Sequence, residues 1–79
     1  MKQVKDIEEL KTLAVEGAEF FIKLNGGMRS SKNITYDKDN DTWEVYNGID
    51  DSLQTCTTAQ LAEDTNIIKA LDYGALWKY

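Results

Sequence analysis

Apolar and small side chains recur every three or four residues in the first third of the chain, the spacing that places them on one face of a helix. They occupy Ile7, Leu10, Ala14, Gly17, Ala18, Phe21 and Leu24. Asp6 is a suitable N-cap, and Glu9 stands at the third position of a capping box. Residues 25–27, Asn-Gly-Gly, suit a helix C-terminus because glycine adopts the left-handed conformation readily. The pattern therefore predicts a helix over residues 7–24.

The middle of the chain favours strands, because β-branched and aromatic residues are concentrated there. Residues 33–36 and 42–46 form two such segments, and residues 37–41 between them have the composition of a turn. A tight turn centred on residues 39–40, or a four-residue loop over 38–41, sets Tyr36 opposite Trp43 and Ile34 opposite Val45. The sequence thus predicts a hairpin whose four paired side chains share one face of a sheet.

A third strand is predicted over residues 53–56, after a turn at residues 50–52. Its register stays open between two alternatives. A two-residue turn pairs Val45 with Cys56, whereas a three-residue turn pairs Ile49 with Leu53.

The last third returns to helical spacing. Thr57 and Gln60 have the spacing of a capping box. An apolar stripe follows at Leu61, Ile67, Ile68 and Leu71, and Gly74 ends it. Residues 64–66, Asp-Thr-Asn, favour helix caps over helix interiors, so they predict a bend or a second cap between two helices.

The C-terminal residues 75–79 are too apolar to stay fully in water, and three outcomes are open for them. They can pair as a further strand along an edge of the sheet, they can lie against a second chain, or they can be disordered, since termini often fray.

These elements predict a single α+β domain over residues 1–79 in the order helix-β-β-β-helix, with a small antiparallel meander sheet covered on one face by two helices. A C-terminal extra strand is a further option. The predicted core contains Leu10, Ala14, Phe21, Ile34, Tyr36, Trp43, Val45, Leu61, Ile68 and Leu71.

Composition excludes several functional classes. The 79 residues contain no His, no Pro and one Cys, and the net charge is −5. Without His there is no Ser-His-Asp or Cys-His centre, and Cys56 alone cannot hold zinc or form a disulfide within the chain. No secretion signal or membrane-spanning run is found, and a single Cys fits the reducing cytoplasm. The negative charge argues against direct binding of nucleic acid or anionic membranes.

Two segments are candidate ligand-binding sites. Residues 37–41 resemble the start of an EF-hand loop, but Thr42 replaces the glycine at position 6 and Gly48 the glutamate at position 12, so we expect a solvated turn, no metal and no cofactor. Arg29, Ser30, Ser31 and Lys32 follow two glycines and could bind an anion. Against this, the run follows a predicted helix C-terminus, whose dipole repels anions, so a helix stop with a solvated approach to an edge strand is favoured over an anion site.

The aromatic residues point to a binding function. Phe20, Tyr46, Tyr73, Trp77 and Tyr79 do not fit easily into so small a core. They are either partly buried under the helices or at the sheet edge, or they form a surface for a partner, since Tyr and Trp often anchor interfaces. The candidates for partner binding are Tyr46, Tyr73, Trp77 and Tyr79. Cys56, in contrast, is expected to be a small buried apolar residue. We therefore expect a non-enzymatic cytoplasmic protein-protein interaction module, acting as a homodimer or as an adaptor.

An alternative uses the acidic residues. In general character the chain is similar to small acidic proteins of bacteria, phages and mobile elements. Such a protein could inhibit a nucleic-acid-binding protein by presenting carboxylates spaced like phosphates. Candidates are Glu8, Glu9, Glu16 and Glu19 on the predicted helix and Asp37, Asp39 and Asp41 in the turn, although Lys5, Lys23 and Lys38 interrupt these sets.

Overall fold

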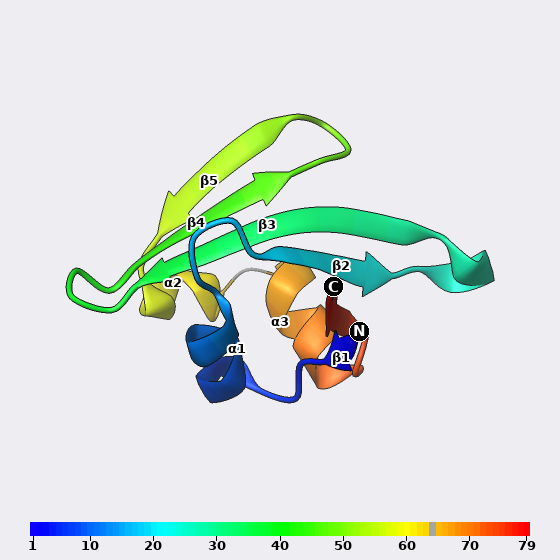
Figure 1. The fold of residues 1–79 in the computed structure, drawn as a ribbon, viewed down its shortest axis with the longest axis horizontal. Coiled ribbons are helices and arrows are strands. Elements are labelled where there is room, and N and C mark those ends of the chain that lie inside the picture. Colours follow the sequence, from blue (N-terminus) through cyan, green and yellow to red (C-terminus); the bar gives the residue numbers. More distant parts are fainter. Residues whose placement is uncertain (64) are drawn as a thin grey trace.

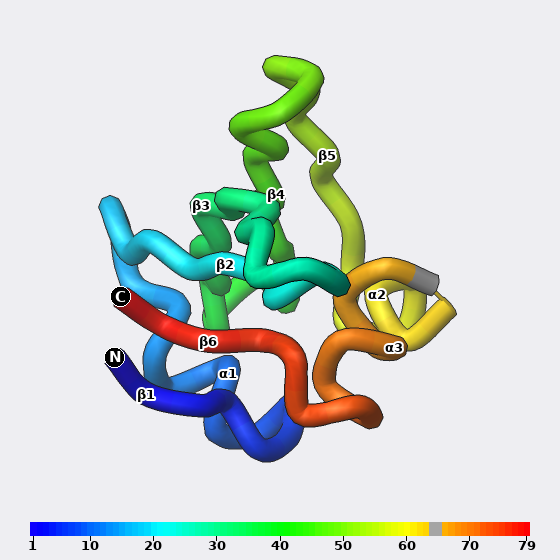
Figure 2. The backbone as a smooth tube through the Cα atoms, turned by 90° about the vertical axis from the view of Figure 1, so that its right-hand side faces the viewer, coloured from blue at the N-terminus to red at the C-terminus, as the bar shows by residue number. Residues whose placement is uncertain are grey.

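The computed structural model describes residues 1–63 and 65–79, which form an α+β fold with a six-stranded antiparallel sheet and three α-helices (Figure 1). The strands are β1 Lys2–Gln3, β2 Glu19–Lys23, β3 Arg29–Asp37, β4 Thr42–Asn47, β5 Ser52–Cys56 and β6 Leu76–Lys78. The helices are α1 Ile7–Leu13, α2 Thr58–Leu61 and α3 Thr65–Asp72, and a 3-10 turn spans Asn25–Gly27. The sheet order is β1-β6-β2-β3-β4-β5, so both chain ends lie side by side within the sheet (Figure 2).

The β3–β4 hairpin has the predicted register. Tyr36 pairs with Trp43 and Ile34 pairs with Val45. Ile34, Trp43 and Val45 are buried on the shared face, and the rings of Tyr36 and Trp43 are 4.3 Å apart between centroids. The turn between the strands is closed by Asn40, whose Nδ2 donates to the Asp37 carboxylate over 2.8 Å. Period-2 alternation and turn chemistry were sufficient to specify this hairpin.

Strand β5 is present, but both predicted registers are wrong. Trp43 pairs with Cys56 and Val45 pairs with Gln54. The connection is longer than either predicted turn, because Asp51 adopts a left-handed conformation (φ 57°) and the Asp50 carboxylate accepts hydrogen bonds from the Ser52 N–H and hydroxyl. Cys56 is buried opposite Trp43, in agreement with the expectation of a small buried residue.

The predicted helix over residues 7–24 is wrong beyond its first two turns. Asp6 caps α1 as expected, its carboxylate accepting from the Glu9 N–H over 2.8 Å, but the helix ends at Leu13. Gly17, with φ 80°, reverses the chain, and residues 19–23 form β2. The glycines at 26 and 27 consequently connect two strands instead of ending a helix.

The C-terminal third agrees with the sequence in its helices and its tail. Thr57 and Gln60 form the capping box of α2, and α3 is a separate helix. The predicted second cap at residues 64–66 includes Asp64, which lies outside the described residues. After Gly74 (φ 67°), β6 pairs with β2 and with β1, so the tail is an intrachain strand, placed inside the sheet and not along its edge.

The main core lies between the sheet and the helices, which occupy the same side of it in Figure 1. Its members are Val4, Leu10, Ala14, Ala18, Phe20, Ile34, Trp43, Val45, Cys56, Leu61, Ile67, Ala70, Leu71 and Leu76. Tyr36 and Ile68 are only partly buried against it. The expectation that Phe20 does not fit into the core is wrong, because β2 places this side chain on the core face, where it is fully buried. Phe21, predicted for this core, is fully buried but contributes to a separate aromatic cluster. The observed order β-α-β-β-β-β-α-α-β replaces the predicted helix-β-β-β-helix order.

Candidate interaction surfaces

An aromatic cluster with two cations forms over β2 and β6, on the sheet face opposite the main core. We call Phe21, Lys23, Arg29, Trp77 and Tyr79 the aromatic-cation surface. Strand pairing places Phe21 directly opposite Trp77, with ring centroids 6.4 Å apart, and Tyr79 lies 4.6 Å from Phe21. The Arg29 guanidinium lies 4.4 Å from the Phe21 ring and 5.9 Å from the Tyr79 ring. Lys23 Nζ lies 4.0 Å from the Trp77 ring, so both cations are held by aromatic faces.

The members of this surface differ in exposure. Phe21 is fully buried, Trp77 is partly buried and Tyr79 is 47% exposed. The Trp77 Nε1–H is shielded from solvent and has no hydrogen-bond acceptor among the described residues. An unsatisfied buried donor costs about 1–3 kcal/mol. The surface therefore combines a rigid aromatic base with a partly exposed rim.

A groove of about 400 Å³ lies between α3 and the ends of β2, β3 and β4. Ser30 and Lys32 line it from β3, Asn47 from β4, Lys69 from α3, and Tyr73 from the turn that follows α3. Both Ser30 and Lys32 are buried, and Lys32 Nζ donates to the Asn47 side-chain oxygen. Tyr73, at the rim, is 81% exposed.

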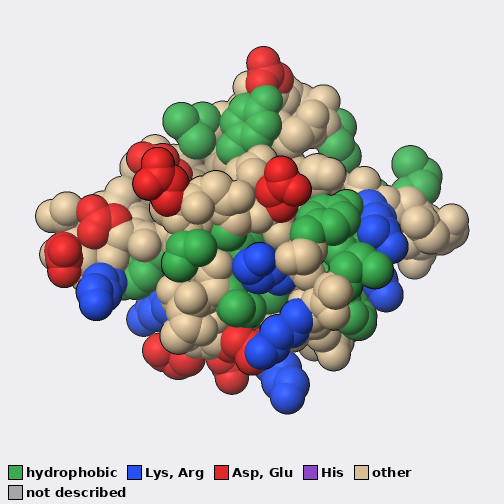
Figure 3. Space-filling view, in the orientation of Figure 1, with side chains coloured by type: hydrophobic (Ala, Val, Ile, Leu, Met, Phe, Trp, Pro, Cys, Tyr) green, Lys and Arg blue, Asp and Glu red, His purple; other side chains and the backbone are tan. Residues whose placement is uncertain are grey.

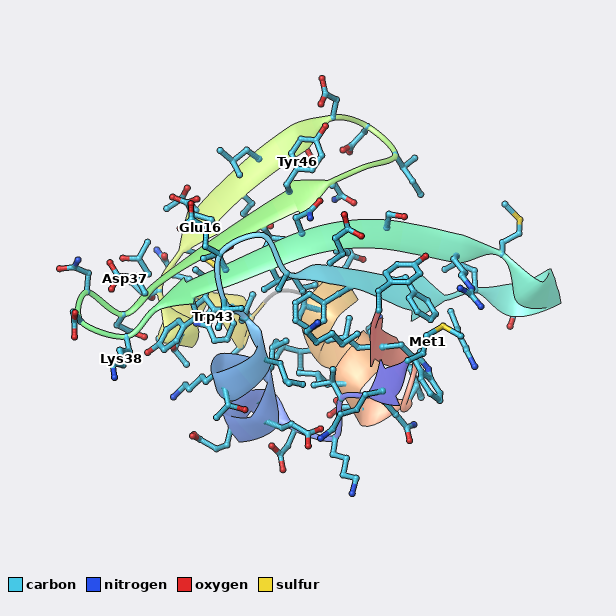
Figure 4. The ribbon with its side chains drawn as sticks, in the orientation of Figure 1. Met1, Glu16, Asp37, Lys38, Trp43 and Tyr46 are labelled. Carbon is cyan, nitrogen blue, oxygen red and sulfur yellow. The ribbon has the colours of Figure 1, made fainter. Side chains whose placement is uncertain are left out.

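A hollow of about 500 Å³ with acidic walls lies at the opposite end of β3. Glu16, Asp37 and Glu44 line it together with Thr35, Asn40 and Thr42. Figure 4 shows Glu16 and Asp37 on the side of the strands away from Trp43. In Figure 3, acidic side chains are spread over this face, and several basic and apolar side chains gather near the chain ends. The acidic hollow and the aromatic-cation surface lie at different ends of β3, since Asp37 is its last residue and Arg29 its first.

The structure distributes the predicted anion-binding residues over two faces. Alternation along β3 places Ser30 and Lys32 in the groove and Arg29 and Ser31 on the opposite face. Arg29 belongs to the aromatic-cation surface. The four side chains therefore do not converge on one ligand.

The four aromatic residues predicted for partner binding also lie on different surfaces of the molecule. Trp77 and Tyr79 lie together on the aromatic-cation surface. Tyr46 lies on β4 and is hydrogen-bonded to Asp51, which raises the pKa of the Tyr46 phenol, and Tyr73 lies on the groove rim. Phe21 and Lys23 were missed as surface residues, because a helix over residues 7–24 puts them on different faces. If residues 19–23 had been predicted as a strand, Phe21 and Lys23 would have been placed together, because side chains two residues apart in a strand lie on the same face of the sheet.

Asp41 closes a hydrogen-bond chain that joins the β3–β4 turn to α2. Trp43 Nε1 donates to the Thr58 hydroxyl over 2.9 Å, and the Thr58 hydroxyl donates to the Asp41 carboxylate. Tyr36 Oη donates to the same carboxylate over 2.9 Å. The Thr58 hydrogen bond, followed by that from Tyr36, lowers the pKa of Asp41.

These hydrogen bonds to Asp41 predict how the stability of the protein depends on pH. A carboxyl whose pKa is lower in the folded state contributes stability above its unfolded pKa, near 4, and loses it as pH falls through the folded value. Asp41→Asn should therefore be less stable than the wild type at pH 7, and the difference should shrink below about pH 4. Urea melts at several pH values measure this, with the exposed turn substitution Asp39→Asn as the charge-matched control. A difference independent of pH would contradict the assignment.

Within residues 1–63 and 65–79, no group of three or more His, Cys, Asp or Glu is arranged to hold a metal ion. Within the same residues, no helix has the length and apolar character needed to cross a membrane.

Comparison with protein-family models gives no match, and comparisons with curated proteins and with solved structures give none either. Inference about function therefore rests on the geometry and chemistry of the surfaces described above.

Proposed function

We propose that this protein is a non-catalytic interaction module, and that the aromatic-cation surface binds a protein partner that presents carboxylates. The observation that carries the proposal is the stacking of Arg29 and Lys23 on the Phe21, Tyr79 and Trp77 rings. Cationic groups gathered on one surface of a chain with net charge −5 favour an acidic partner by charge complementarity. Cys56 is a buried thiol outside any disulfide among the described residues, which is compatible with a reducing compartment such as the cytoplasm.

The composition of this surface is suited to binding. Trp, Tyr and Arg are the residues most enriched among those that dominate binding energy at interfaces. Here they are held against a buried phenylalanine, so they lose little conformational freedom when a partner docks. The two sides of the sheet thus have different roles in the proposal: one buries the main core, and the other binds the partner.

Site-specific crosslinking tests the proposal. A photoreactive benzoylphenylalanine replaces Tyr79, and the protein is irradiated in cells of the organism that encodes it. We expect a discrete adduct with one protein, lost when Arg29→Ala is added, because that change removes the stacked cation. The same photoreactive residue in place of Tyr73, which is exposed on another surface, is the matched control and should give no such adduct.

The outcomes separate the forms of the proposal. An adduct of two copies of this chain identifies the partner as a second copy and supports a homodimer, whereas an adduct with a different protein supports an adaptor. No adduct, or equal adducts from positions 73 and 79, overturns the proposal. Trp77→Phe provides a further check: it removes a buried donor without an acceptor, so stability should change by less than about 1 kcal/mol while binding weakens.

The acidic hollow favours a second candidate, the acidic inhibitor that mimics nucleic acid. The carboxylate row expected on a long helix is wrong in part, because Glu16 and Glu19 lie beyond the end of α1. Glu16 instead lines the hollow with Asp37 and Glu44. A photoreactive residue at Thr42 would support this candidate if it captured a nucleic-acid-binding protein that added DNA displaces. Capture that DNA does not displace would contradict it.

A further inference from the structure

The two edges of the sheet are built differently. Edge strand β1 has only two residues, one of them Lys2. Edge strand β5 has five residues and no charge, and it pairs with β4 in a continuous register without a bulge. Short length, charge, proline and bulges are the usual devices that prevent an edge from pairing with another chain. One edge therefore carries such devices, whereas β5 carries none.

The β5 edge offers both backbone and apolar contacts. In the described part of the chain no strand lies beyond β5, and four of its five residues are exposed. Leu53 is 65% exposed and pairs with Tyr46, which lies beside it on β4 and is 36% exposed. Figure 2 shows the β4–β5 hairpin projecting from the body of the molecule. An added strand would thus gain main-chain hydrogen bonds and contact with an apolar strip.

Carboxylates bracket this neutral strand. Residues 41–58 contain four acidic residues and no Lys or Arg. Asp50 and Asp51 precede β5, while Asp41 is held at its other end by the Thr58 hydroxyl. Hydrogen bonds, chiefly from Ser52 to Asp50 and from Thr58 to Asp41, lower the pKa of both carboxyls.

We propose that the free edge of β5 accepts an extended segment of a partner protein, with Lys or Arg at both ends of the segment, as an added β-strand. Charge selects this occupant over a second copy of the chain. An antiparallel copy would bring Asp50 and Asp51 against the other copy's Asp41, and a parallel copy would bring like ends together. Either arrangement opposes carboxylates, whereas a basic segment neutralises them.

The probe is the synthetic peptide Lys-Arg-Thr-Val-Thr-Val-Thr-Arg-Lys, titrated into the full chain and followed by amide NMR shifts. We expect shifts concentrated at residues 52–56 and at Tyr46. Two matched peptides test the chemistry: one has Glu in place of each Lys and Arg, and one is N-methylated at every residue of its Thr-Val-Thr-Val-Thr segment, so that neither of its edges can pair. Each should bind at least about tenfold more weakly. No shifts up to about 1 mM peptide, or undiminished binding by the N-methylated peptide, overturns the proposal.

Substitutions in the chain locate the site. Leu53→Lys should weaken binding about tenfold, because it adds a charge to the edge and repels the basic peptide. Tyr73→Lys makes the same charge change just after the end of α3 and should leave binding unchanged within about twofold. Equal effects of both variants would contradict the site. Self-association without peptide, abolished by Leu53→Lys in sedimentation, would overturn the choice of occupant.

This inference is independent of the proposed function of the aromatic-cation surface. Tyr79→Ala should leave peptide binding to β5 unchanged, and Leu53→Lys should leave the crosslink from position 79 unchanged. Each proposal can therefore fail while the other holds. If both hold, the module joins an acidic partner to a basic extended segment.

Discussion

Trp43→Ala is expected to lower the free energy of unfolding by about 3–5 kcal/mol, the usual cost of truncating a buried tryptophan. Trp43 is fully buried, its ring lies 4.3 Å from that of Tyr36, and its Nε1 donates to Thr58. A domain of this size has a total stability of about 4–12 kcal/mol. The substitution thus removes a large share of the total, and urea melts followed by circular dichroism measure it.

Tyr46→Ala is the matched control for this prediction. Tyr46 is on the same strand but on the opposite face, where it is 36% exposed, and Figure 4 shows the two side chains pointing away from each other. It should cost about 1 kcal/mol or less. Trp43→Phe, which keeps much of the volume and loses the hydrogen bond to Thr58, should fall between the two. A loss below about 1 kcal/mol for Trp43→Ala would mean that this side chain does not anchor the core.

The elements that could be predicted from the sequence are those set by neighbouring residues. The β3–β4 hairpin joins segments that are close in the chain, so alternation and turn composition define its register. The caps at Asp6 and Thr57 are likewise local, since each involves residues three apart. The register of β5 failed because it depends on the left-handed conformation of Asp51, which composition alone does not reveal.

Strand β2 could not be distinguished from a helix for a different reason. A strand with one buried face alternates apolar and polar residues, but β2 buries Phe20 in the main core and Phe21 in the opposite cluster. Its apolar residues therefore run consecutively, which also fits a broad helical face. The aromatic-cation surface could not be predicted for the same reason. It forms only when Phe21 of β2 pairs with Trp77 of β6, and this pairing requires β2 to be a strand.

Removal of β6 is the second change for which we expect a large effect. Deletion of residues 76–79 removes the strand that lies between β1 and β2, together with the fully buried Leu76. It also removes the backbone bond from Val4 N–H to the Leu76 carbonyl and the rings that cover Phe21. The summed loss should exceed the total stability of the domain, which is about 4–12 kcal/mol. The truncated chain should therefore be unfolded at every protein concentration.

Leu76→Ala gives a graded version of the same experiment. It should cost about 2–5 kcal/mol, with a loss that does not depend on protein concentration and with no change of mass in sedimentation. Tyr79→Ala is the control, because Tyr79 follows the last residue of β6 and is 47% exposed, so it should cost about 1 kcal/mol or less. If the deletion instead left a folded protein and only reduced its mass from dimer to monomer, the C-terminal residues would pair with a second chain and not with β2. A loss of stability with unchanged mass for Leu76→Ala would instead show that β6 stabilises its own chain, because the buried Leu76 side chain packs in the core of the same molecule.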